Sequence, residues 1–452
     1  MSTASLPRGR LADPGVPVAI RTSRGVEAAA AFAIFLPLMF VGQITSAAPA
    51  LSFGFTLIYV WIRRRELAGV LRQNWLLLLI PAYALVSVIW SGYPGITAKH
   101  SFELMLTILG GLMLSASRHP ASVLTGAAAA FALFLGVSFA YGHSVGVGTM
   151  GLSDQELRAF SGLNAGKNLL AMTAAMGLLS ALFVFCRSVR RLWLISAAVS
   201  GAALAMEAYL VVAARSAGAS IAVVLAVAAF AVMSALGALG PRARAFVTAL
   251  LVACLAAAGL VAEAFAHAIT SDALQIFHKD PTLTGRAYLW YRSRDIIAQH
   301  PWLGRGFEAF WVHGNMDAEG LWQYAGITNR GGFNFHNTLI ELMVTFGWVG
   351  TCFITAVFLV ACAALLRRCI REPSLVSGAY IAFAVFQISR MPFESLTPSP
   401  VDLGTLLIFI VLGYGFAQGE PRRMSVASAG SGAALALRFR RPALAHRPRL
   451  QG

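Results

Sequence analysis

The chain has 452 residues, of which 58% are hydrophobic and only 12% are charged, and its formal net charge is +16. This composition excludes an ordinary soluble domain and indicates a polytopic membrane protein. The positive charge does not indicate nucleic-acid binding. Most basic residues lie in short connections and in the two tails, which is where orientation charge lies in membrane proteins.

Residues 1–25 are rich in Pro, Gly and Arg, and we expect them to form a disordered cytoplasmic tail. About twelve apolar segments follow, and most are long enough to cross ~30 Å of hydrocarbon at ~1.5 Å per residue. Because backbone polar groups must be satisfied inside lipid, we expect these segments to be helices. The second segment is short, and a break near Pro49 is the alternative. The expected spans are 26–47, 49–62, 73–91, 98–116, 121–141, 166–186, 191–213, 217–239, 244–265, 336–366, 374–392 and 399–418.

The sequence therefore predicts an all-α polytopic protein. Nine spans lie in residues 26–265, a long external loop with an amphipathic helix occupies 266–335, three further spans lie in 336–418, and a basic tail occupies 419–452. Basic clusters fall on alternate connections, which share a side with the N-terminus. The positive-inside rule assigns that side to the cytoplasm, so both termini are expected there and the long loop outside.

Ionisable residues inside the spans show a second regularity, since each is expected in the outer third of its helix. Such residues are costly in a membrane and usually functional. The pattern indicates a polar pocket that opens at the outer surface, and snorkelling of charged groups at helix ends is the alternative. The residues are Lys99, His100, Glu103, Glu207, Glu263, Glu341, Arg390 and Asp402.

Three external residues are candidates for chemistry on a phosphorylated substrate. Arg215 lies between the seventh and eighth spans, Arg286 lies in a helix that Thr284 could cap, and His336 begins the tenth span. Guanidinium groups bind phosphate oxygens, and a histidine can activate a hydroxyl as a general base. Headgroup contact for the arginines, and packing or a local hydrogen bond for the histidine, are the structural alternatives.

A fourth external feature is the start of the sixth span, where Lys167 and Asn168 follow Gly162 and Gly166. Backbone N–H groups at a helix start, together with a lysine, suit an anion. A flexible glycine-flanked helix start is an equally good interpretation. The external loops contain no DxD motif and no clear cluster of His and Asp, so we predict no metal site and no cofactor.

Taken together, the runs GR(x3)W, HPWLGRGF and HN(x3)EL(x4)GWVG resemble the signature of the O-antigen ligase and polymerase superfamily. That superfamily includes O-antigen ligases, Wzy-type polymerases and exopolysaccharide polymerases of rhizobial type. The GKN element at the sixth span resembles an element of the exopolysaccharide branch, with Gly166 as a departure, and ARSAGAS resembles the start of the eighth span, with Ala214 as a departure. The resemblance covers about residues 160–360 and extends elsewhere only as topology.

The resemblance implies metal-independent, inverting glycosyl transfer at the periplasmic face of the bacterial inner membrane. The donor would be a glycan on undecaprenyl diphosphate, and the acceptor either a second lipid-linked glycan in a polymerase or lipid A-core in a ligase. Arg215 and Arg286 would hold the diphosphate, and His336 would be the base or would position the acceptor. Membrane lipids, and polysaccharide export or chain-length proteins, are further candidate partners.

Further candidate residues share these external positions. Glu394 and Asp402 are candidates to orient His336, because carboxylates often orient a catalytic imidazole. The candidates for contact with phosphate or sugar are Lys167, Asn168, Trp290, Arg305 and Asn337.

Two other classes of protein compete with this hypothesis. A secondary transporter or lipid-linked glycan flippase would place charges near mid-depth and have short loops, whereas this chain has one long external loop. A structural scaffold for an export complex would make the external basic residues dispensable. Within the transferase class, the GKN element slightly favours an exopolysaccharide polymerase.

Overall fold

The computed structural model describes residues 22–146, 158–249, 284–327, 330 and 333–417. Most of both tails, most of the predicted ninth span, with Glu263, and the first part of the external loop lie outside these residues. The described residues up to Phe416 belong to one compact unit, and the features below all lie within it.

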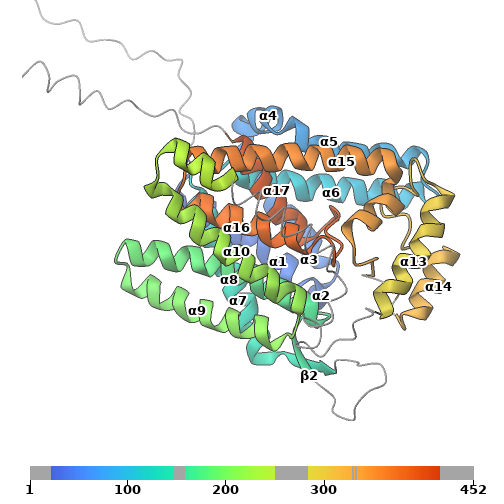
Figure 1. Ribbon diagram of the computed structural model, residues 1–452, viewed down its shortest axis with the longest axis horizontal. Coiled ribbons are helices and arrows are strands. Elements are labelled where there is room, and N and C mark those ends of the chain that lie inside the picture. The colour runs from blue at the N-terminus through green and yellow to red at the C-terminus, as the bar shows by residue number, and fades with distance from the viewer. Residues whose placement is uncertain (1–21, 147–157, 250–283, 328–329, 331–332, 418–452) are drawn as a thin grey trace, which may run out of the picture. The chain divides into compact units, whose positions relative to one another are not determined.

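The described part of the chain is almost entirely helical (Figure 1). Its N-terminal half contains α1 (Arg24–Met39), α2 (Val41–Ile44), α3 (Ala47–Ile62), α4 (Arg64–Gln73), α5 (Trp75–Val86), the short 3-10 helix η1 (Ser87–Ile89), α6 (Pro94–Ser115), α7 (Pro120–Tyr141) and α8 (Lys167–Arg190). Its C-terminal half contains α9 (Leu194–Ala213), α10 (Ala217–Ala235), η2 (Leu236–Ala238), α13 (Thr284–Gln299), α14 (Met316–Tyr324), α15 (Thr338–Arg371), α16 (Leu375–Arg390) and α17 (Leu403–Phe416). Residues 241–249 are also helical.

Several of these helices are long and apolar enough to cross a membrane. In the described part, five helices meet that test, or six if α4 and α5 with η1 form one bent span, and α3, α16 and α17 are shorter apolar helices. The protein is therefore a multi-pass membrane protein, while the full count of twelve spans stays a prediction. The turn near the second predicted span lies at Thr45, whose φ is 43°, and Pro49 is accommodated in the first turn of α3.

The predicted all-α architecture has one exception. Strand β1 (His143–Gly146) pairs antiparallel with β2 (Arg158–Gly162) in the connection between the predicted spans 121–141 and 166–186. Gly162 has a φ of 59°, and a Cβ there would lie 2.0 Å from Ser138 Oγ, so the close return of the chain onto α7 requires glycine. Four residues lie between the end of β2 and the start of α8.

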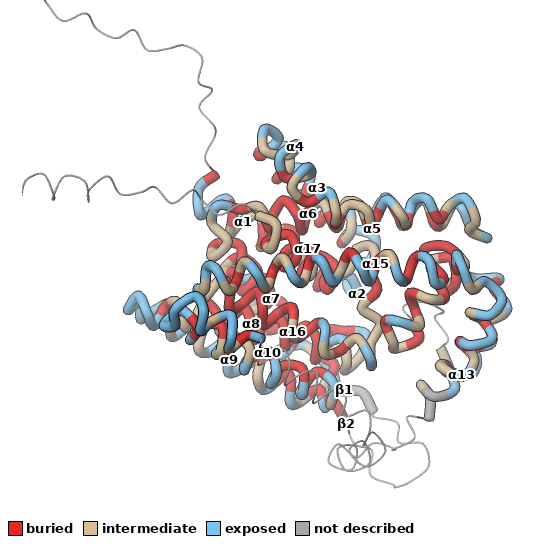
Figure 2. Tube along the Cα trace, turned by 45° about the horizontal axis from the view of Figure 1, so that its top comes forward, coloured by how far each residue is buried: buried red, intermediate tan, exposed pale blue. Residues whose placement is uncertain are grey.

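The buried core lies along the centre of the helical bundle. Figure 2 shows buried residues concentrated in α8, α16 and α17, whereas α9 is largely exposed on its outer side. A second, smaller core joins α13 and α14 to the segments around Phe310 and Phe335. It is rich in aromatic rings, with Trp311 packed edge-on against Phe310 and Phe333.

The segment Pro301–Gly306 packs directly against a break in α15, and this contact was not predicted from the sequence. Gly347, in the middle of the predicted tenth span, has φ 61° and ψ −168°, so the helix is interrupted there. Trp348 N donates to Pro301 O at 2.8 Å, and Arg305 N donates to Val344 O at 2.9 Å. The intruding segment thus supplies hydrogen-bond partners to the backbone groups that the break leaves free.

Two of the sequence motifs are therefore joined through their backbones. A Cβ at Gly347 would lie 2.4 Å from the carbonyl carbon of Trp302, and one at Gly304 would lie 2.5 Å from Phe346 N. The same segment is fixed to the neighbouring helices, because Trp90 Nε1 donates to Leu303 O at 2.8 Å. In this way the HPWLGRGF loop holds α15 at its break and links it to the segment after η1.

We expect Gly347→Ala to destabilise the protein by about 2–4 kcal/mol, because alanine meets both an unfavourable φ and the backbone of Trp302. The measurement is the midpoint of thermal unfolding of the purified protein in detergent. Gly218→Ala in α10 is the matched control, since a Cβ there meets nothing within 4 Å. Equal midpoints for the two variants would contradict the role given to this contact.

Candidate active site

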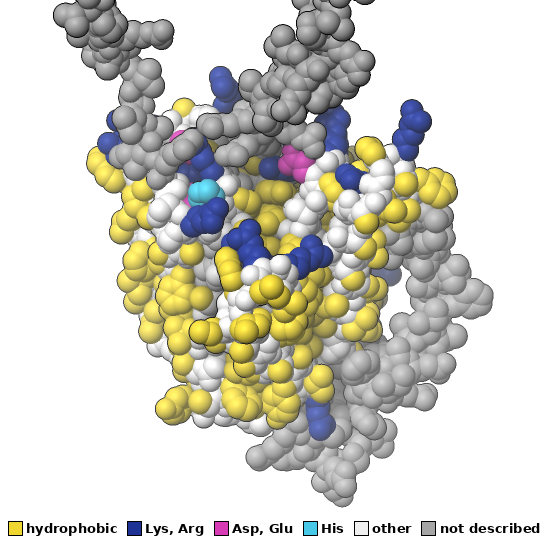
Figure 3. Space-filling model, turned by 90° about the vertical axis from the view of Figure 1, so that its left-hand side faces the viewer, with side chains coloured by type: hydrophobic (Ala, Val, Ile, Leu, Met, Phe, Trp, Pro, Cys, Tyr) yellow, Lys and Arg dark blue, Asp and Glu magenta, His cyan; other side chains and the backbone are white. Residues whose placement is uncertain are grey.

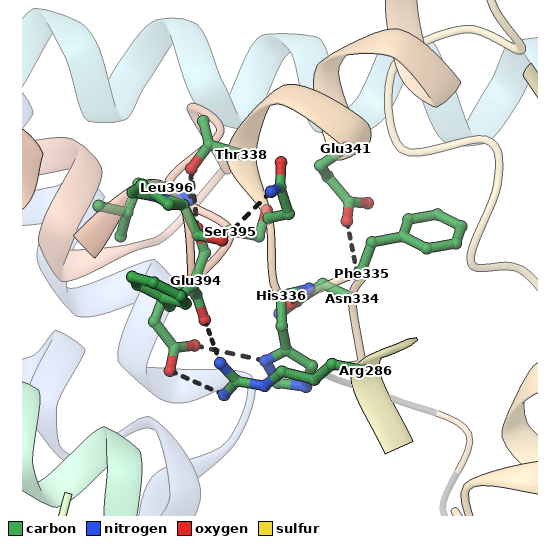
Figure 4. A network of polar contacts seen from close by, with 12 residues as sticks. Arg286, Asn334, Phe335, His336, Thr338, Glu341, Glu394, Ser395 and Leu396 are labelled. Atoms are coloured by element: carbon green, nitrogen blue, oxygen red, sulfur yellow. Dashed lines mark hydrogen bonds and ion pairs between the residues drawn. The ribbon is translucent and has the colours of Figure 1, made fainter. Parts of the chain in front are cut away.

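Three segments that are far apart in sequence bring Arg286, His336 and Glu394 into contact (Figure 4). Arg286 comes from α13, His336 from the turn before α15, and Glu394 from the connection between α16 and α17. Arg286 Nη2 lies 3.2 Å from Glu394 Oε1, and His336 Nδ1 lies 3.3 Å from Glu394 Oε2. One carboxylate therefore bridges the guanidinium and the imidazole.

The backbone around His336 is held in an unusual conformation. His336 has a φ of 51°, in the left-handed region that non-glycine residues rarely adopt. Its N–H donates to Asn334 Oδ1 at 2.8 Å, and Asn337 Oδ1 accepts from Ile340 N at 3.0 Å as the cap of α15. The helix thus begins at Thr338 and not at His336 as predicted.

Two hydrogen bonds of Thr338 fix the Glu394 segment against this turn. Thr338 Oγ1 donates to Glu394 O at 2.8 Å and accepts from Leu396 N at 2.9 Å. Arg286 Nη1 also donates to Phe393 O at 2.6 Å. The sequence analysis missed Thr338, and its position directly after the HN pair was the available signal.

The aromatic core supports the other side of the turn. Trp290 Nε1 donates to Phe335 O at 2.8 Å, and Phe335 N donates to Glu341 Oε2 at 2.9 Å. Glu341 Oε1 accepts a further hydrogen bond from Trp311 Nε1 at 2.9 Å. Trp290, expected to contact sugar, is thus engaged in holding the backbone beside His336. Asn337 is similarly engaged, since its Nδ2 donates to Pro392 O at 3.2 Å.

The electrostatics of the cluster keep Glu394 ionised. Burial by itself would raise the pKa of Glu394, but the hydrogen bond from His336 and the positive charges of Arg286 and Arg390 outweigh it and hold this pKa below its usual range. A carboxylate accepts only, so His336 Nδ1 must carry the hydrogen that faces it. In the neutral imidazole, Nε2 then carries the lone pair that can accept a proton.

The cluster is accessible from outside the protein. The side chains of Arg286, Glu394 and His336 are 22%, 21% and 26% exposed, so none is sealed in the core. In the described part of the chain, no group of three or more His, Cys, Asp or Glu residues could hold a metal ion. Arg286 contributes the guanidinium group of this cluster.

Not all predicted site residues join this cluster. Arg305 is paired with Asp317 at 2.7 Å and also donates to Gln299, which ties the loop to α14. Asp402 Oδ2 accepts from Thr405 N at 2.6 Å and so caps the first turn of α17, and it is Glu394 that contacts His336. Both residues have structural partners that account for their placement.

The other two predicted elements lie at separate helix starts. Arg215 is exposed between α9 and α10 with a φ of 48°, and no contact among the described residues joins it to Glu394 or His336. Lys167 is the first residue of α8, and Asn168 has a buried Oδ1 without a hydrogen-bond partner.

We expect Asp402→Ala to lower stability by about 1 kcal/mol, as the loss of a helix cap does, without a specific loss of activity. Thermal unfolding and product formed per amount of folded protein are the two measurements. A loss of product far beyond the loss of folded protein would show that Asp402 acts on the site and not only on α17.

The fold and the cluster define a multi-pass membrane protein in which a partly exposed arginine, carboxylate and histidine lie beside a small aromatic core. Comparison with protein families finds that residues 202–355 match the family described as O-antigen ligase. This match includes Arg215, Arg286 and His336, but it ends before Glu394.

A curated relative extends the match over most of the chain. The exopolysaccharide production protein ExoQ of Rhizobium meliloti (strain 1021) is 28% identical over 369 residues, which is 80% of this chain and 81% of the relative. The two matches confirm the resemblance to the O-antigen ligase and polymerase superfamily that the motifs predicted. They support a role as a membrane glycan ligase or polymerase in polysaccharide synthesis.

Proposed function

We propose that this protein transfers a glycan from undecaprenyl diphosphate to a sugar hydroxyl at the periplasmic face of the bacterial inner membrane, without a metal ion. The observation that carries the proposal is the contact of Arg286 and His336 with the two oxygens of Glu394. Phosphate recognition and proton acceptance are thereby available side by side, in a chain that resembles glycan ligases and polymerases.

His336 is the general base in this proposal. Glu394 holds Nδ1–H, so Nε2 accepts the proton of the acceptor hydroxyl as its oxygen attacks the anomeric carbon. The new bond from carbon to the acceptor oxygen forms as the bond from carbon to the diphosphate oxygen breaks. The electron pair of the broken bond leaves with undecaprenyl diphosphate, and attack from the opposite face inverts the anomeric carbon.

Arg286 stabilises the leaving diphosphate. Its guanidinium has more N–H donors than its bonds to Phe393 and Glu394 use, so donors remain for phosphate oxygens. Charge builds up on the diphosphate as the glycosidic bond breaks, and fixed donors are most effective for such developing charge. We assign Arg215, which is exposed at a helix junction, to the same diphosphate.

The acceptor in this proposal is a second lipid-linked glycan, which makes the protein a polymerase. The similarity to a protein named for exopolysaccharide production favours this choice over transfer to lipid A-core. The GKN element at the start of α8 favours it too.

The test is a deletion of the gene, complemented with the wild type or with a triple variant in which Arg215, Arg286 and His336 are alanine. Gels of lipopolysaccharide and of secreted polysaccharide are the readout. We expect the deletion and the triple variant to lose high-mass exopolysaccharide with normal lipopolysaccharide. Unattached O-antigen would instead identify a ligase, and full activity of a well-expressed triple variant would refute the proposed chemistry.

A further inference from the structure

The end of the bundle where α8 meets α9 carries a lateral groove between three helices. It encloses about 840 Å³ and is lined by α7, α8 and α9. Its walls are mainly small or apolar, and residues that form them include Ala128, Ala132, Ala181, Val184, Leu194 and Val199. A groove with such apolar walls in a membrane protein suits a hydrocarbon chain.

Arginines cluster at one end of this groove. Arg187 Nη1 donates to Thr125 Oγ1 at 3.3 Å, and Thr125 is one of the few polar residues of the lining. Arg187 and Arg191 both lie over the ring of Trp193, at 5.4 and 5.1 Å from its centroid. Trp193 also lines the groove, so the ring connects the arginines to the apolar walls.

No carboxylate among the described residues pairs with the arginines of this cluster. Arg187 is within electrostatic reach of Arg191 and Arg24. Among the described residues, none of these arginines has a carboxylate within 4.0 Å, in contrast to Arg63, Arg118 and Arg368 near other helix ends. Figure 3, which faces the left-hand side of Figure 1, shows basic side chains gathered over apolar ones at this end of the bundle.

We propose that the groove is a binding site for one anionic phospholipid, with its phosphate at Arg187 and Arg191 and an acyl chain against α7, α8 and α9. Arg187 and Arg191, which have no carboxylate partner among the described residues, can bind an anion. The apolar walls beside them can bind a hydrocarbon chain. Basic pockets between membrane helices are known to bind anionic headgroups. The inference is independent of the proposed glycan transfer.

The test uses the full chain reconstituted in vesicles of equal amounts of phosphatidylglycerol and phosphatidylcholine. The protein is then extracted in mild detergent, and the lipids that stay bound are counted by mass spectrometry. We expect wild type to retain phosphatidylglycerol over phosphatidylcholine by on the order of tenfold, and Arg187→Gln with Arg191→Gln to bring the ratio close to one.

Arg64→Gln is the matched control, because Arg64 also lies over a tryptophan, at 4.6 Å from the Trp61 centroid, but Trp61 does not line the groove. Retained selectivity in the double variant would overturn the proposal. An equal loss with Arg64→Gln would also overturn it, since it would show only diffuse attraction to the membrane surface.

A second variant tests the apolar part of the site. Ala129 is exposed in the groove, so Ala129→Trp fills it without disturbing the core. We expect fewer bound lipids of both kinds with the arginines intact, and unchanged retention would refute the groove as the seat of the acyl chain. Displacement by one equivalent of a polyprenyl phosphate would show that an isoprenoid, not a phospholipid, is the occupant.

Discussion

We expect His336→Ala to lower the rate of glycan transfer by about 10²–10⁴-fold, which is the usual contribution of a general base. Glu394 holds the imidazole at Nδ1. In the proposed mechanism, Nε2 takes the proton of the acceptor hydroxyl. The loss should fall on kcat more than on KM, because the base acts only as the acceptor attacks. The measurement is the consumption of lipid-linked glycan by the reconstituted protein.

His313→Ala is the matched control for this variant. His313 lies between α13 and α14 and is also close to a carboxylate, with its Nδ1 3.9 Å from Glu319 Oε1, but its side chain is 70% exposed and its carboxylate partner is not Glu394. We expect the control to stay within about twofold of wild type. If both variants lose activity equally, the loss reflects a disturbance of the whole segment between α13 and α15, and His336 is not the base.

The helices were the most predictable part of the structure. The predicted helix that contains Arg286 is α13, and its apolar residues Leu289 and Ile296, which are seven residues apart, are both buried. The start of α15 was displaced by two residues, because the side chain of Asn337 caps the helix after a left-handed His336. Propensity gives a helix, but the cap decides its first residue.

The break at Gly347 could not be predicted from its own surroundings. The sequence around it is continuously apolar and reads as one span, and a glycine within a span more often signals close packing. The interruption depends on Pro301–Gly306, whose backbone enters the break and bonds to both sides of it. Local sequence carries no information on a partner that lies forty residues away.

The site was predictable as a region and not as a set of contacts. Glu394 and Asp402 were both candidates because the predicted topology places them on the same side of the membrane as His336. The topology alone does not determine which of the two carboxylates contacts the imidazole. The turn after α16 brings Glu394 to His336, while Asp402 is used by the first turn of α17. Likewise, Arg286 and Arg305 were both candidates to bind phosphate. The structure distinguishes them, because Arg305 pairs with Asp317 and Arg286 pairs with Glu394.

We expect Arg286→Ala to lower glycan transfer by about 10²–10³-fold, which is the cost of removing one donor from developing negative charge. Arg286→Lys should recover little of this, because an ammonium cannot hold Glu394 and a phosphate with the same planar geometry. Arg292→Ala is the matched control on the same helix, since Arg292 pairs with Asp295 on an exposed face. The control should behave as wild type.

A double-mutant cycle separates the two roles of Arg286. If it only fixes Glu394, then removing it from a Glu394→Gln protein should change nothing further, because the carboxylate that it holds is already gone. If it also stabilises the leaving diphosphate, the second substitution should lower the rate again by at least about tenfold. We expect the second outcome, because the guanidinium keeps N–H donors beyond those that bond to Glu394 and Phe393. Only a group that contacts the diphosphate would cause this further loss of rate.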